Sequence, residues 1–232
     1  MTHRNTLLLN LVTRAGASER RFEVEQAVIA GWTSRDVEAM EKHIRELEEI
    51  GVPRPASTPI YYRVGAARIT GADAIEAAGG DSSGEVEFVM FNVDGRLWIG
   101  VGSDHTDRKV ETYNIPVSKQ MCDKPVASTV WPWDELVDHW ESLVLRSHIV
   151  TGGKRELYQE GSVAAMRAPV DLIERYEAGH GKFTPGTVMF GGTLAAKGGI
   201  RPADRFEFEL VDATLNRHIA HAYGIDVLPI AG

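Results

Sequence analysis

The sequence predicts an α+β protein, mainly β, in which a mixed, mostly antiparallel sheet rolls into a barrel-like shape with a few peripheral helices. Short segments with alternating or continuous apolar residues recur along the chain, separated by turns that contain glycine or proline. Few segments show helical periodicity, and strands do not alternate with helices in βαβ fashion. Together these observations favour an antiparallel architecture over a doubly wound parallel sheet.

The chain begins with two predicted strands. Apolar alternation marks residues 6–12 and 22–29 as strands, and Gly16 with Ser18 marks a hairpin-like turn between them. A first antiparallel pair is therefore expected before any helix.

The clearest helix is predicted over residues 34–50, because apolar residues recur there at intervals of three and four. Those positions are Val37, Met40, Ile44, Leu47 and Ile50. Ser34 can cap the start of this helix, and Gly51 followed by Pro53 ends it. The prolines at 53–59 then predict an extended passage.

Later elements are predicted from the same signals. In chain order they are a strand at 85–93, a tight turn at Asp94-Gly95, a strand at 97–101, a short helix within 131–143, a strand at 143–150 and a helix at 169–178. From residue 185 onward the chain is predicted to be rich in strands. We expect residues 1–232 to form a single domain, with N-terminal strands and a helix in 1–80 and a β core in 81–232.

Composition excludes several classes of function. The net charge of −8 and the lack of a basic run disfavour binding to nucleic acid, which needs clustered lysine and arginine. A lone cysteine, Cys122, excludes a disulfide framework and a thiolate metal cluster. No stretch approaches the roughly 18 apolar residues of a membrane span, and the apolar segment 7–12 is too short for a signal peptide. We therefore expect a cytoplasmic protein without membrane or nucleic-acid partners.

Two pairs of glutamates alternate along predicted strands, but their neighbours differ. Glu85 and Glu87 lie on a strand that is apolar on both faces and should be buried. Buried adjacent carboxylates repel each other, and a divalent cation offsets this because hard cations prefer carboxylate oxygens. Glu207 and Glu209 follow Arg205 and stand opposite an apolar face, which is typical of a solvated strand surface. Only the first pair is a candidate metal site.

Several further segments occur in an order that resembles a known family. They are Gly84-Glu85-Val86-Glu87, Ser103-Asp104-His105-Thr106-Asp107-Arg108, Lys119-Gln120-Met121-Cys122-Asp123-Lys124-Pro125, Pro185-Gly186-Thr187-Val188-Met189-Phe190-Gly191-Gly192-Thr193 and Ile200-Arg201-Pro202-Ala203-Asp204. With His43-Ile44-Arg45-Glu46 before them and Asn216 after them, the chain resembles the fumarylacetoacetate hydrolase superfamily over most of its length. Ser103 and Leu194 replace a family asparagine and proline, so the resemblance is to a divergent branch.

The resemblance implies a fumarylacetoacetase-type catalytic fold with a metal site formed by Glu85, Glu87 and Asp104, although Asp104 taken alone is typical of a turn. All-carboxylate ligands favour Mg²⁺, or Mn²⁺, over Zn²⁺. A 2-oxo acid could chelate such an ion, which would stabilise the enolate that forms when a C–C bond breaks. The resemblance also implies a homodimer.

The resemblance further implies a catalytic dyad on the predicted helix, which would act as a lid. Glu46 would orient the imidazole of His43, three residues earlier, while His43 takes a proton from water. The alternative is a surface histidine with an incidental glutamate neighbour. The remaining implied site residues are Lys119 as a catalytic cation, Arg108 as a substrate-binding cation, and Gly192 with Thr193 as a substrate-binding turn.

The sequence thus predicts a metal-dependent hydrolase that cleaves a C–C bond in a small 2-oxo or 2,4-dioxo acid, as an acylpyruvase does. One alternative uses the same metal site for decarboxylation, hydration or tautomerisation, and another is a member that binds a carboxylate metabolite without catalysis. His105 is expected to point away from Asp104. Trp131, Trp133 and Trp140 predict a packed aromatic patch in the core or at an interface.

Overall fold

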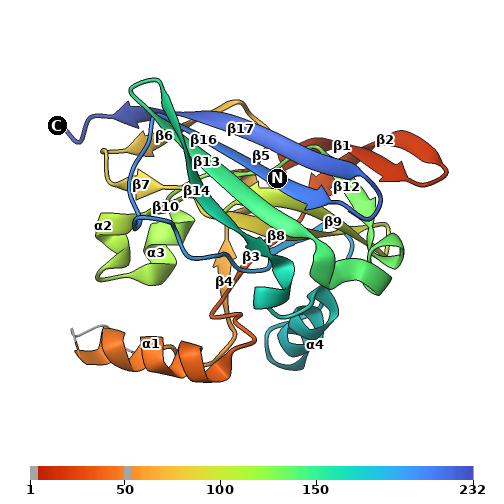
Figure 1. The fold of residues 1–232 in the computed structure, drawn as a ribbon, viewed down its shortest axis with the longest axis horizontal. Coiled ribbons are helices and arrows are strands. Elements are labelled where there is room, and N and C mark those ends of the chain that lie inside the picture. Colours follow the sequence, from red (N-terminus) through yellow and green to blue (C-terminus); the bar gives the residue numbers. More distant parts are fainter. Residues whose placement is uncertain (1–4, 50–53, 232) are drawn as a thin grey trace.

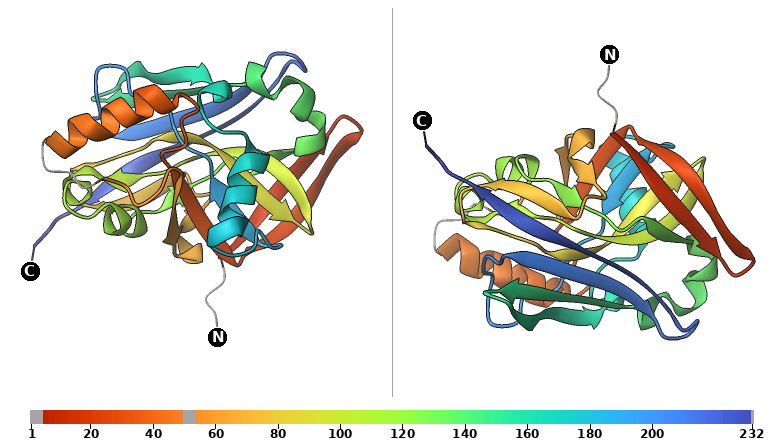
Figure 2. Two further views of the ribbon diagram at one scale, coloured as in Figure 1. Left: turned by 90° about the horizontal axis from the view of Figure 1, so that it is seen from below. Right: turned by 90° about the horizontal axis from the view of Figure 1, so that it is seen from above.

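Two sheets, one of eight strands and one of five, form most of the molecule. This computed structural model describes residues 5–49 and 54–231, apart from the side chains of His43 and Leu47. The sheets lie against each other and the helices lie at the periphery (Figure 1), while the first two strands project as a hairpin at one end (Figure 2). The predicted mainly β, mixed and mostly antiparallel architecture is confirmed.

The larger sheet takes its strands from both halves of the chain. In spatial order they are β2 (Gly16–Val24), β1 (Asn5–Thr13), β12 (Thr129–Pro132), β9 (Arg96–Ser103), β8 (Val86–Val93), β15 (Thr187–Phe190), β3 (Gln26–Gly31) and β4 (Ile60–Val64). The pairs β1·β12 and β15·β3 are parallel, and the other neighbours are antiparallel. The strand predicted at 22–29 is two strands, because the chain breaks at Glu25 to leave the β2 edge and join β15.

The smaller sheet is antiparallel except at one edge. In spatial order its strands are β14 (Lys154–Ser162), β13 (Val144–Thr151), β16 (Arg205–Asp212), β17 (Arg217–Leu228) and β6 (Ala74–Ala78), with β17 and β6 parallel. Along β16, Phe206, Phe208 and Leu210 are buried, whereas Glu207 and Glu209 face outward and pair with arginines. This alternation agrees with the surface role predicted for the second glutamate pair.

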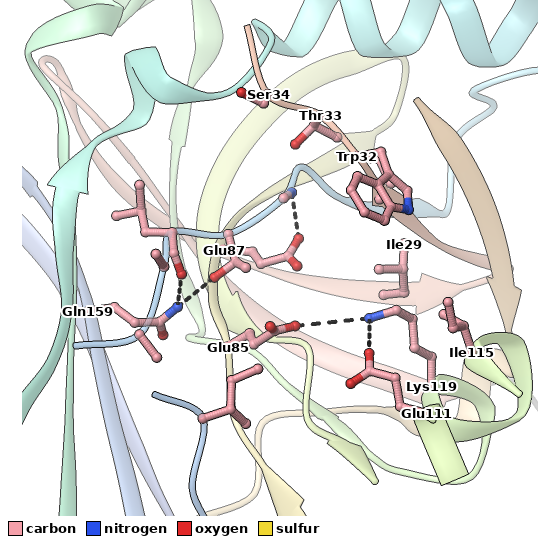
Figure 3. A pocket seen from close by; sticks show the side chains of 18 of the residues that line it. Ile29, Trp32, Thr33, Ser34, Glu85, Glu87, Glu111, Ile115, Lys119 and Gln159 are labelled. Atoms are coloured by element: carbon pink, nitrogen blue, oxygen red, sulfur yellow. Dashed lines mark hydrogen bonds and ion pairs between the residues drawn. The ribbon is translucent and has the colours of Figure 1, made fainter. Parts of the chain in front are cut away.

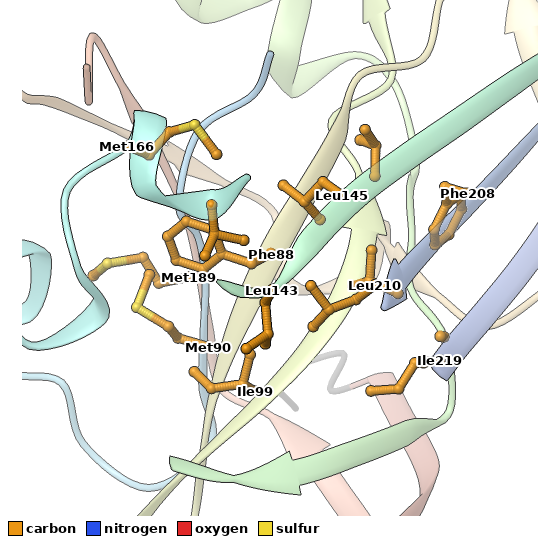
Figure 4. Close-up of a cluster of buried hydrophobic side chains, with 14 of the residues drawn as sticks. Phe88, Met90, Ile99, Leu143, Leu145, Met166, Met189, Phe208, Leu210 and Ile219 are labelled. Carbon is orange, nitrogen blue, oxygen red and sulfur yellow. The ribbon is translucent and has the colours of Figure 1, made fainter. Parts of the chain in front are cut away.

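A hydrophobic core fills the space between the two sheets (Figure 4). Phe88 and Met90 of β8 pack there with Leu145 of β13 and with Phe208 and Leu210 of β16. Residues of alternating number on β8 must then face the other side of the sheet, because successive side chains of a strand point in opposite directions.

A second core lies on that other side, inside the curl of the larger sheet. Leu9 and Phe22 come from one end of the sheet and Ile29 and Tyr62 from the other, and both pairs pack in one cluster with Phe91 of β8. Strand β8 is therefore covered on both faces, and all its residues from Val86 to Val93 are buried.

The longer helices lie close to their predicted positions. The helices are α1 (Val37–Glu49), α2 (Arg108–Glu111), α3 (Ile115–Gln120) and α4 (Pro169–Gly179). Helix α1 begins later than predicted, because Asp36 rather than Ser34 accepts the backbone N–H of Ala39. Its predicted stop at Gly51 and Pro53 lies outside the described residues. No described helix has the length and apolarity needed to cross a membrane.

The short helix predicted within 131–143 is present as 3₁₀ turns, but it starts later than predicted. Trp131 and Pro132 pair with β9 and so belong to β12, and short 3₁₀ turns follow at Trp133–Glu135 and Val137–Ser142. Trp131 and Trp140 are buried in the core between the sheets, and Trp133 packs edge-on against Trp140, with ring centroids 5.2 Å apart. The predicted aromatic patch is thus part of the core.

Short pairings hold the segments around the start of β8. They involve β5 (Ile69–Thr70) with β11 (Lys124–Pro125), and β7 (Ser82–Ser83) with β10 (Thr106–Asp107). Further 3₁₀ turns lie at Ala66–Arg68 and Val163–Ala165. Because β7 and β10 flank the β8–β9 hairpin, they fix the chain on both sides of its open end.

Candidate active site

Three carboxylates meet at the open end of the β8–β9 hairpin. Glu85 precedes β8, Glu87 is on β8, and Asp104 follows β9. The antiparallel register pairs Val86 with Ser103, and the Asp104 N–H donates to the Glu85 carbonyl at 3.0 Å. One oxygen of each carboxylate lies within 4.8 Å of the other two. The structure therefore brings together the three residues predicted as metal ligands.

Asp104 is fully buried and is held by two lysines. Lys119 of α3 donates to Oδ2 at 2.6 Å, and the Nζ of Lys124 lies 3.2 Å from Oδ1. Lys124 also donates to the carbonyls of His105 and Cys122. Burial by itself raises the pKa of a carboxyl group, but the two lysines outweigh it and lower the pKa of Asp104 to about 2. Asp104 is therefore an anion at neutral pH.

Two cations connect Glu85 with a further glutamate, Glu111. Arg108 donates to Glu111 at 2.8 Å, and its Nη2 lies 3.4 Å from Oε1 of Glu85. The Nζ of Lys119 lies 4.0 Å from each of these glutamates. Burial by itself lowers the pKa of Arg108 and of Lys119, but the nearby carboxylates outweigh it and raise both pKa values. Both side chains stay charged.

Glu87 differs from the other two carboxylates. It is buried, and its Oε2 accepts the backbone N–H of Gly192 at 2.6 Å. No lysine or arginine in the described part of the chain pairs with it within 4.0 Å. Burial, and then the charges of Asp104 and Glu85, raise the pKa of Glu87 well above its ordinary value. The cluster therefore lacks positive charge at Glu87.

The donor set fits a hard divalent cation. All three groups offer carboxylate oxygens, which Mg²⁺ and Mn²⁺ prefer, whereas Zn²⁺ favours nitrogen and sulfur. A cation beside Glu87 would supply the missing positive charge and keep this carboxylate ionised. Among the described residues, no other group of three histidine, cysteine or acidic side chains is arranged to hold a metal.

A cavity of about 830 Å³ opens over Glu85 and Glu87 (Figure 3). Its walls come from the β3–α1 connection, from β4, from α2 and α3, from β14 and from residues 192–196. These segments are distant in sequence, and both sheets contribute to them, because β14 belongs to the smaller sheet. Arg108 and Lys119, predicted to act on the substrate, both line this cavity.

One side of the cavity is polar and internally bonded. Gln159 of β14 donates to Oγ1 of Thr193 at 2.8 Å, and the Thr193 hydroxyl donates to the Val86 carbonyl at 2.8 Å. The Gly192 N–H is engaged by Glu87 (Figure 3). Gly192 and Thr193 thus both line the cavity, but the Gly192 N–H is bonded to Glu87 and the Thr193 hydroxyl is bonded to β8. A direct contact with substrate stays a prediction for both.

The opposite side of the cavity carries apolar side chains beside the charged pair Lys119 and Glu111 (Figure 3). Figure 3 shows Trp32, Ile29 and Ile115 across the two glutamates from Gln159. Trp32 follows β3 and has a φ of +56°, a left-handed conformation that costs a residue other than glycine about 1–3 kcal/mol. The fold thus holds a strained tryptophan at the cavity.

Only one member of the predicted dyad, Glu46, has a described side chain. The side chain of His43 lies outside the described residues. Glu46 is 56 % exposed, its carboxylate lies 3.8 Å from the Nζ of Lys42, and it is not among the described residues that line the cavity. Met40, on the same helix, does line the cavity. A catalytic role for His43 and Glu46 therefore stays a prediction.

His105, next to Asp104, belongs to a buried network instead of the cavity. Its Nδ1 lies 2.9 Å from the Tyr223 hydroxyl, and its Nε2 lies 2.8 Å from Oγ of Ser82. Burial, with the charges of Lys124 and Arg108, lowers the pKa of His105 to about 3. The imidazole is therefore neutral and buttresses the segment behind the carboxylates.

Sequence reasoning missed Glu111, Lys124 and Trp32 as site residues. Glu111 has a local signal, because it stands three residues after Arg108 and can pair with it on one helical turn. Lys124 was present in the motif of Lys119, but only the folded chain shows that both lysines reach Asp104. Nothing local marks Trp32.

Residues 30–223 match a protein family described as "Protein of unknown function (DUF2848)". The chain belongs to this family. A comparison of this DUF2848 protein with curated proteins finds no significant match.

Solved structures similar to this DUF2848 protein share its fold at low identity. A proposed fumarylacetoacetate isomerase/hydrolase from Oleispira antarctica is 18% identical, with a TM-score of 0.62 over 94% of this chain and 99% of that one. A proposed fumarylpyruvate hydrolase from Burkholderia cenocepacia is also 18% identical, with a TM-score of 0.62 over 99% of this chain and 94% of that one.

A third similar structure is a 2-keto-3-deoxy-D-arabinonate dehydratase complexed with magnesium and 2,5-dioxopentanoate. It is 17% identical, with a TM-score of 0.62 over 91% of this chain and 77% of that one. The predicted resemblance to the fumarylacetoacetate hydrolase superfamily is thus confirmed at the level of the fold. That fold serves both hydrolases and dehydratases.

Proposed function

We propose that this DUF2848 protein is a divalent-metal-dependent hydrolase that cleaves a C–C bond in a small 2-oxo or 2,4-dioxo acid. The observation that carries the proposal is Glu87, a buried carboxylate with a raised pKa, beside Glu85 and Asp104 at the cavity. The similar dehydratase, complexed with magnesium and 2,5-dioxopentanoate, supports a divalent metal in a protein of this fold.

Glu85, Glu87 and Asp104 would hold Mg²⁺ or Mn²⁺. When bound, such an ion supplies Lewis-acid stabilisation for the negative charge that develops on the keto oxygen as the C–C bond breaks. Lys119, with Lys124 behind it, keeps Asp104 ionised and in place.

Arg108 and Lys119 are the cations that would bind the substrate carboxylate. Both line the cavity, both remain charged, and both already contact carboxylates of the cluster. A guanidinium group can form two parallel hydrogen bonds to a carboxylate, so Arg108 is suited to fix the orientation of the acid group.

His43 and Glu46 would activate water for attack on the distal carbonyl group. In this role the water proton passes to the imidazole of His43, and the carboxylate of Glu46 stabilises the imidazolium. Helix α1, which carries both residues, borders the cavity through Met40.

A second candidate is a decarboxylase, hydratase or tautomerase that uses the same carboxylates. The exposed position of Glu46 and the similarity to a dehydratase favour it. The variant His43→Ala separates the two: loss of acylpyruvate hydrolysis supports the hydrolase, and unchanged hydrolysis removes the dyad from the mechanism. Ligand binding without turnover of any 2-oxo acid would indicate the third candidate, a metabolite-binding protein.

The proposal is tested by metal titration. We expect Mg²⁺, added after chelator treatment, to raise the melting temperature of the wild type saturably, because an ion that binds the folded state alone stabilises it. At 100 times the dissociation constant the gain is about 2.7 kcal/mol. Glu87→Gln should abolish the rise, whereas Glu209→Gln, from the surface pair of equal spacing, should retain it. No rise in the wild type would refute the metal site.

We also propose that residues 1–232 act as one catalytic domain, with the lid helix in 1–80 and the metal-binding core in 81–232, and that the chain forms a homodimer. Sedimentation equilibrium tests the second statement, and the mass of a single chain at every concentration would contradict it.

A further inference from the structure

We propose that the cavity takes a monocarboxylic 2-oxo acid with an apolar alkyl or aryl tail, and that it discriminates against dicarboxylic acids. The assignment of the 2-oxo acid end, the head of this substrate, rests on the function proposed above. The tail is inferred independently, from the charges and the apolar wall of the cavity.

The charge balance of the cavity leaves room for one carboxylate. Glu85, Glu87 and Glu111 contribute three negative charges to the described lining, and Arg108 and Lys119 contribute two positive charges. Asp104, behind this lining, is offset by Lys124. A divalent cation then leaves an excess of one positive charge, which the carboxylate of a single 2-oxo acid head neutralises.

A second substrate carboxylate would have to share a cation that already has a carboxylate partner. Opposite Gln159 lie Trp32, Ile29 and Ile115 with Lys119 beside them (Figure 3), and Met40 and Tyr62 also line the cavity. Among the described lining residues, Arg108 and Lys119 are the only lysines or arginines, and both are already engaged at the carboxylate cluster. A charged group loses its hydration there without compensation, whereas an alkyl or aryl group gains by burial.

The cavity is also larger than a short acid requires. Its volume of about 830 Å³ lies in the upper part of the range of roughly 300–1,000 Å³ that is usual for small-molecule sites. Ile29, Met40 and Tyr62 are themselves buried in the fold, so this wall is preformed. Trp32 adds its indole to the cavity lining from a backbone conformation that favours glycine.

Calorimetric titration with unreactive 2-oxo acids at saturating Mg²⁺ tests the inference. The probes are pyruvate, 2-oxohexanoate, phenylpyruvate and 2-oxoadipate, of which 2-oxohexanoate and 2-oxoadipate have the same number of carbons and differ in the distal carboxylate. We expect up to about fourfold tighter binding for each buried methylene, which corresponds to about 0.8 kcal/mol. We expect 2-oxoadipate to bind at least about tenfold more weakly than 2-oxohexanoate, because its distal charge stays unpaired.

The outcomes separate this inference from the proposed function. If pyruvate binds only with Mg²⁺ but 2-oxohexanoate binds no tighter, or 2-oxoadipate binds as well as 2-oxohexanoate, the tail site is refuted and the metal-dependent function stands. If the apolar tail increases affinity equally with and without Mg²⁺, the tail site is supported. The same result contradicts the proposed metal-dependent binding of the 2-oxo acid head. Absence of binding by every probe refutes both.

Variants at Trp32 locate the effect. Trp32→Gly removes the indole and suits the left-handed backbone, so we expect it to lose most of the tail gain while pyruvate affinity stays unchanged. Trp32→Phe keeps an apolar ring and should retain most of the gain. If the longer acids gain as much affinity over pyruvate in Trp32→Gly as in the wild type, the indole is not part of the tail site. If Trp32→Gly does not fold, the comparison of 2-oxohexanoate with 2-oxoadipate on the wild type still decides the inference.

Discussion

Asp104 and Glu87 show how neighbouring residues acquire opposite chemistry in one cluster. Both carboxylates are buried, and burial by itself raises the pKa of each. Two lysines reach Asp104 and lower its pKa to about 2, whereas Glu87 faces the charges of Asp104 and Glu85 and its pKa rises. The same burial therefore yields one permanent anion and one carboxylate that needs a cation to stay ionised.

This difference predicts how metal-free stability depends on pH. Above pH 4.5, the ordinary pKa of a glutamate, the unfolded chain loses the Glu87 proton while the folded protein retains it. The folded state then binds more protons, so stability falls as pH rises, by up to about 1.4 kcal/mol per pH unit, until the folded pKa is passed. Asp104 acts oppositely, because its pKa is lower in the folded state. Its contribution to folding stability is fully present above pH 3.8 and is lost as pH falls through about 2.

Urea unfolding at a series of pH values measures this prediction. Between pH 4.5 and neutrality, the metal-free wild type should lose stability relative to Glu87→Gln, which carries no titrating proton at this position. Saturating Mg²⁺ should remove the loss in the wild type. If the free energy of unfolding varies with pH in the same way for the two metal-free proteins, the raised pKa of Glu87 is contradicted.

Substitution of Lys124, which is not among the described residues that line the cavity, is expected to destabilise the protein. Lys124→Met leaves the fully buried Asp104 with one ammonium partner and removes the donor to the carbonyls of His105 and Cys122, and a buried acceptor left without its donor costs about 1–3 kcal/mol. Lys109→Met, the same substitution at an exposed position on α2, should leave stability essentially unchanged. Urea unfolding of both variants provides the measurement, and equal effects would contradict the structural role of Lys124.

At the scale of elements, the glycine pair after β15 lets this segment pass close to β8. A Cβ on Gly191 would lie 2.1 Å from the ring of Phe88, and a Cβ on Gly192 would lie 1.9 Å from Oγ1 of Thr33. The close passage brings the Gly192 N–H to Glu87. These glycines are therefore required by the approach of two segments around the site.

Alanine substitutions test this close passage. Gly191→Ala forces Phe88 or the backbone to move, and overpacking of this kind costs typically about 1–3 kcal/mol. Gly179→Ala, at the end of α4, meets no atom within 4 Å and should stabilise the fold by about 0.4–1 kcal/mol, because alanine reduces the entropy of the unfolded chain. Chemical denaturation distinguishes the two, and a neutral Gly191→Ala would contradict the close packing.

The elements also show the reach of local signals. The β8–β9 hairpin and helix α4 lie close to their predicted positions, because strand alternation, the Asp94-Gly95 turn and a terminal glycine are local features. The short helix predicted within 131–143 starts later, as 3₁₀ turns, because Trp131 and Pro132 pair with β9, and no local pattern reveals that pairing.

At the scale of the whole molecule, the curled larger sheet and strand β14 of the smaller sheet both contribute to the cavity. The larger sheet brings Ile29 and Tyr62 from one of its ends into the same core as Leu9 and Phe22 from the other. The cavity therefore joins the β3–α1 connection with β14 and the segment after β15, which no single stretch of sequence could indicate.

The sequence by itself determined the buried strand with Glu85 and Glu87, because apolar residues on both faces of one strand indicate burial of both faces. It also determined the superfamily fold through the order of its motifs. Only the tertiary structure decided that Lys119 and Lys124 share Asp104, that Glu87 lacks such a partner, and that Trp32 faces the same cavity. Those facts depend on contacts between segments distant in sequence, and such contacts arise only when the sheet curls and closes around its core.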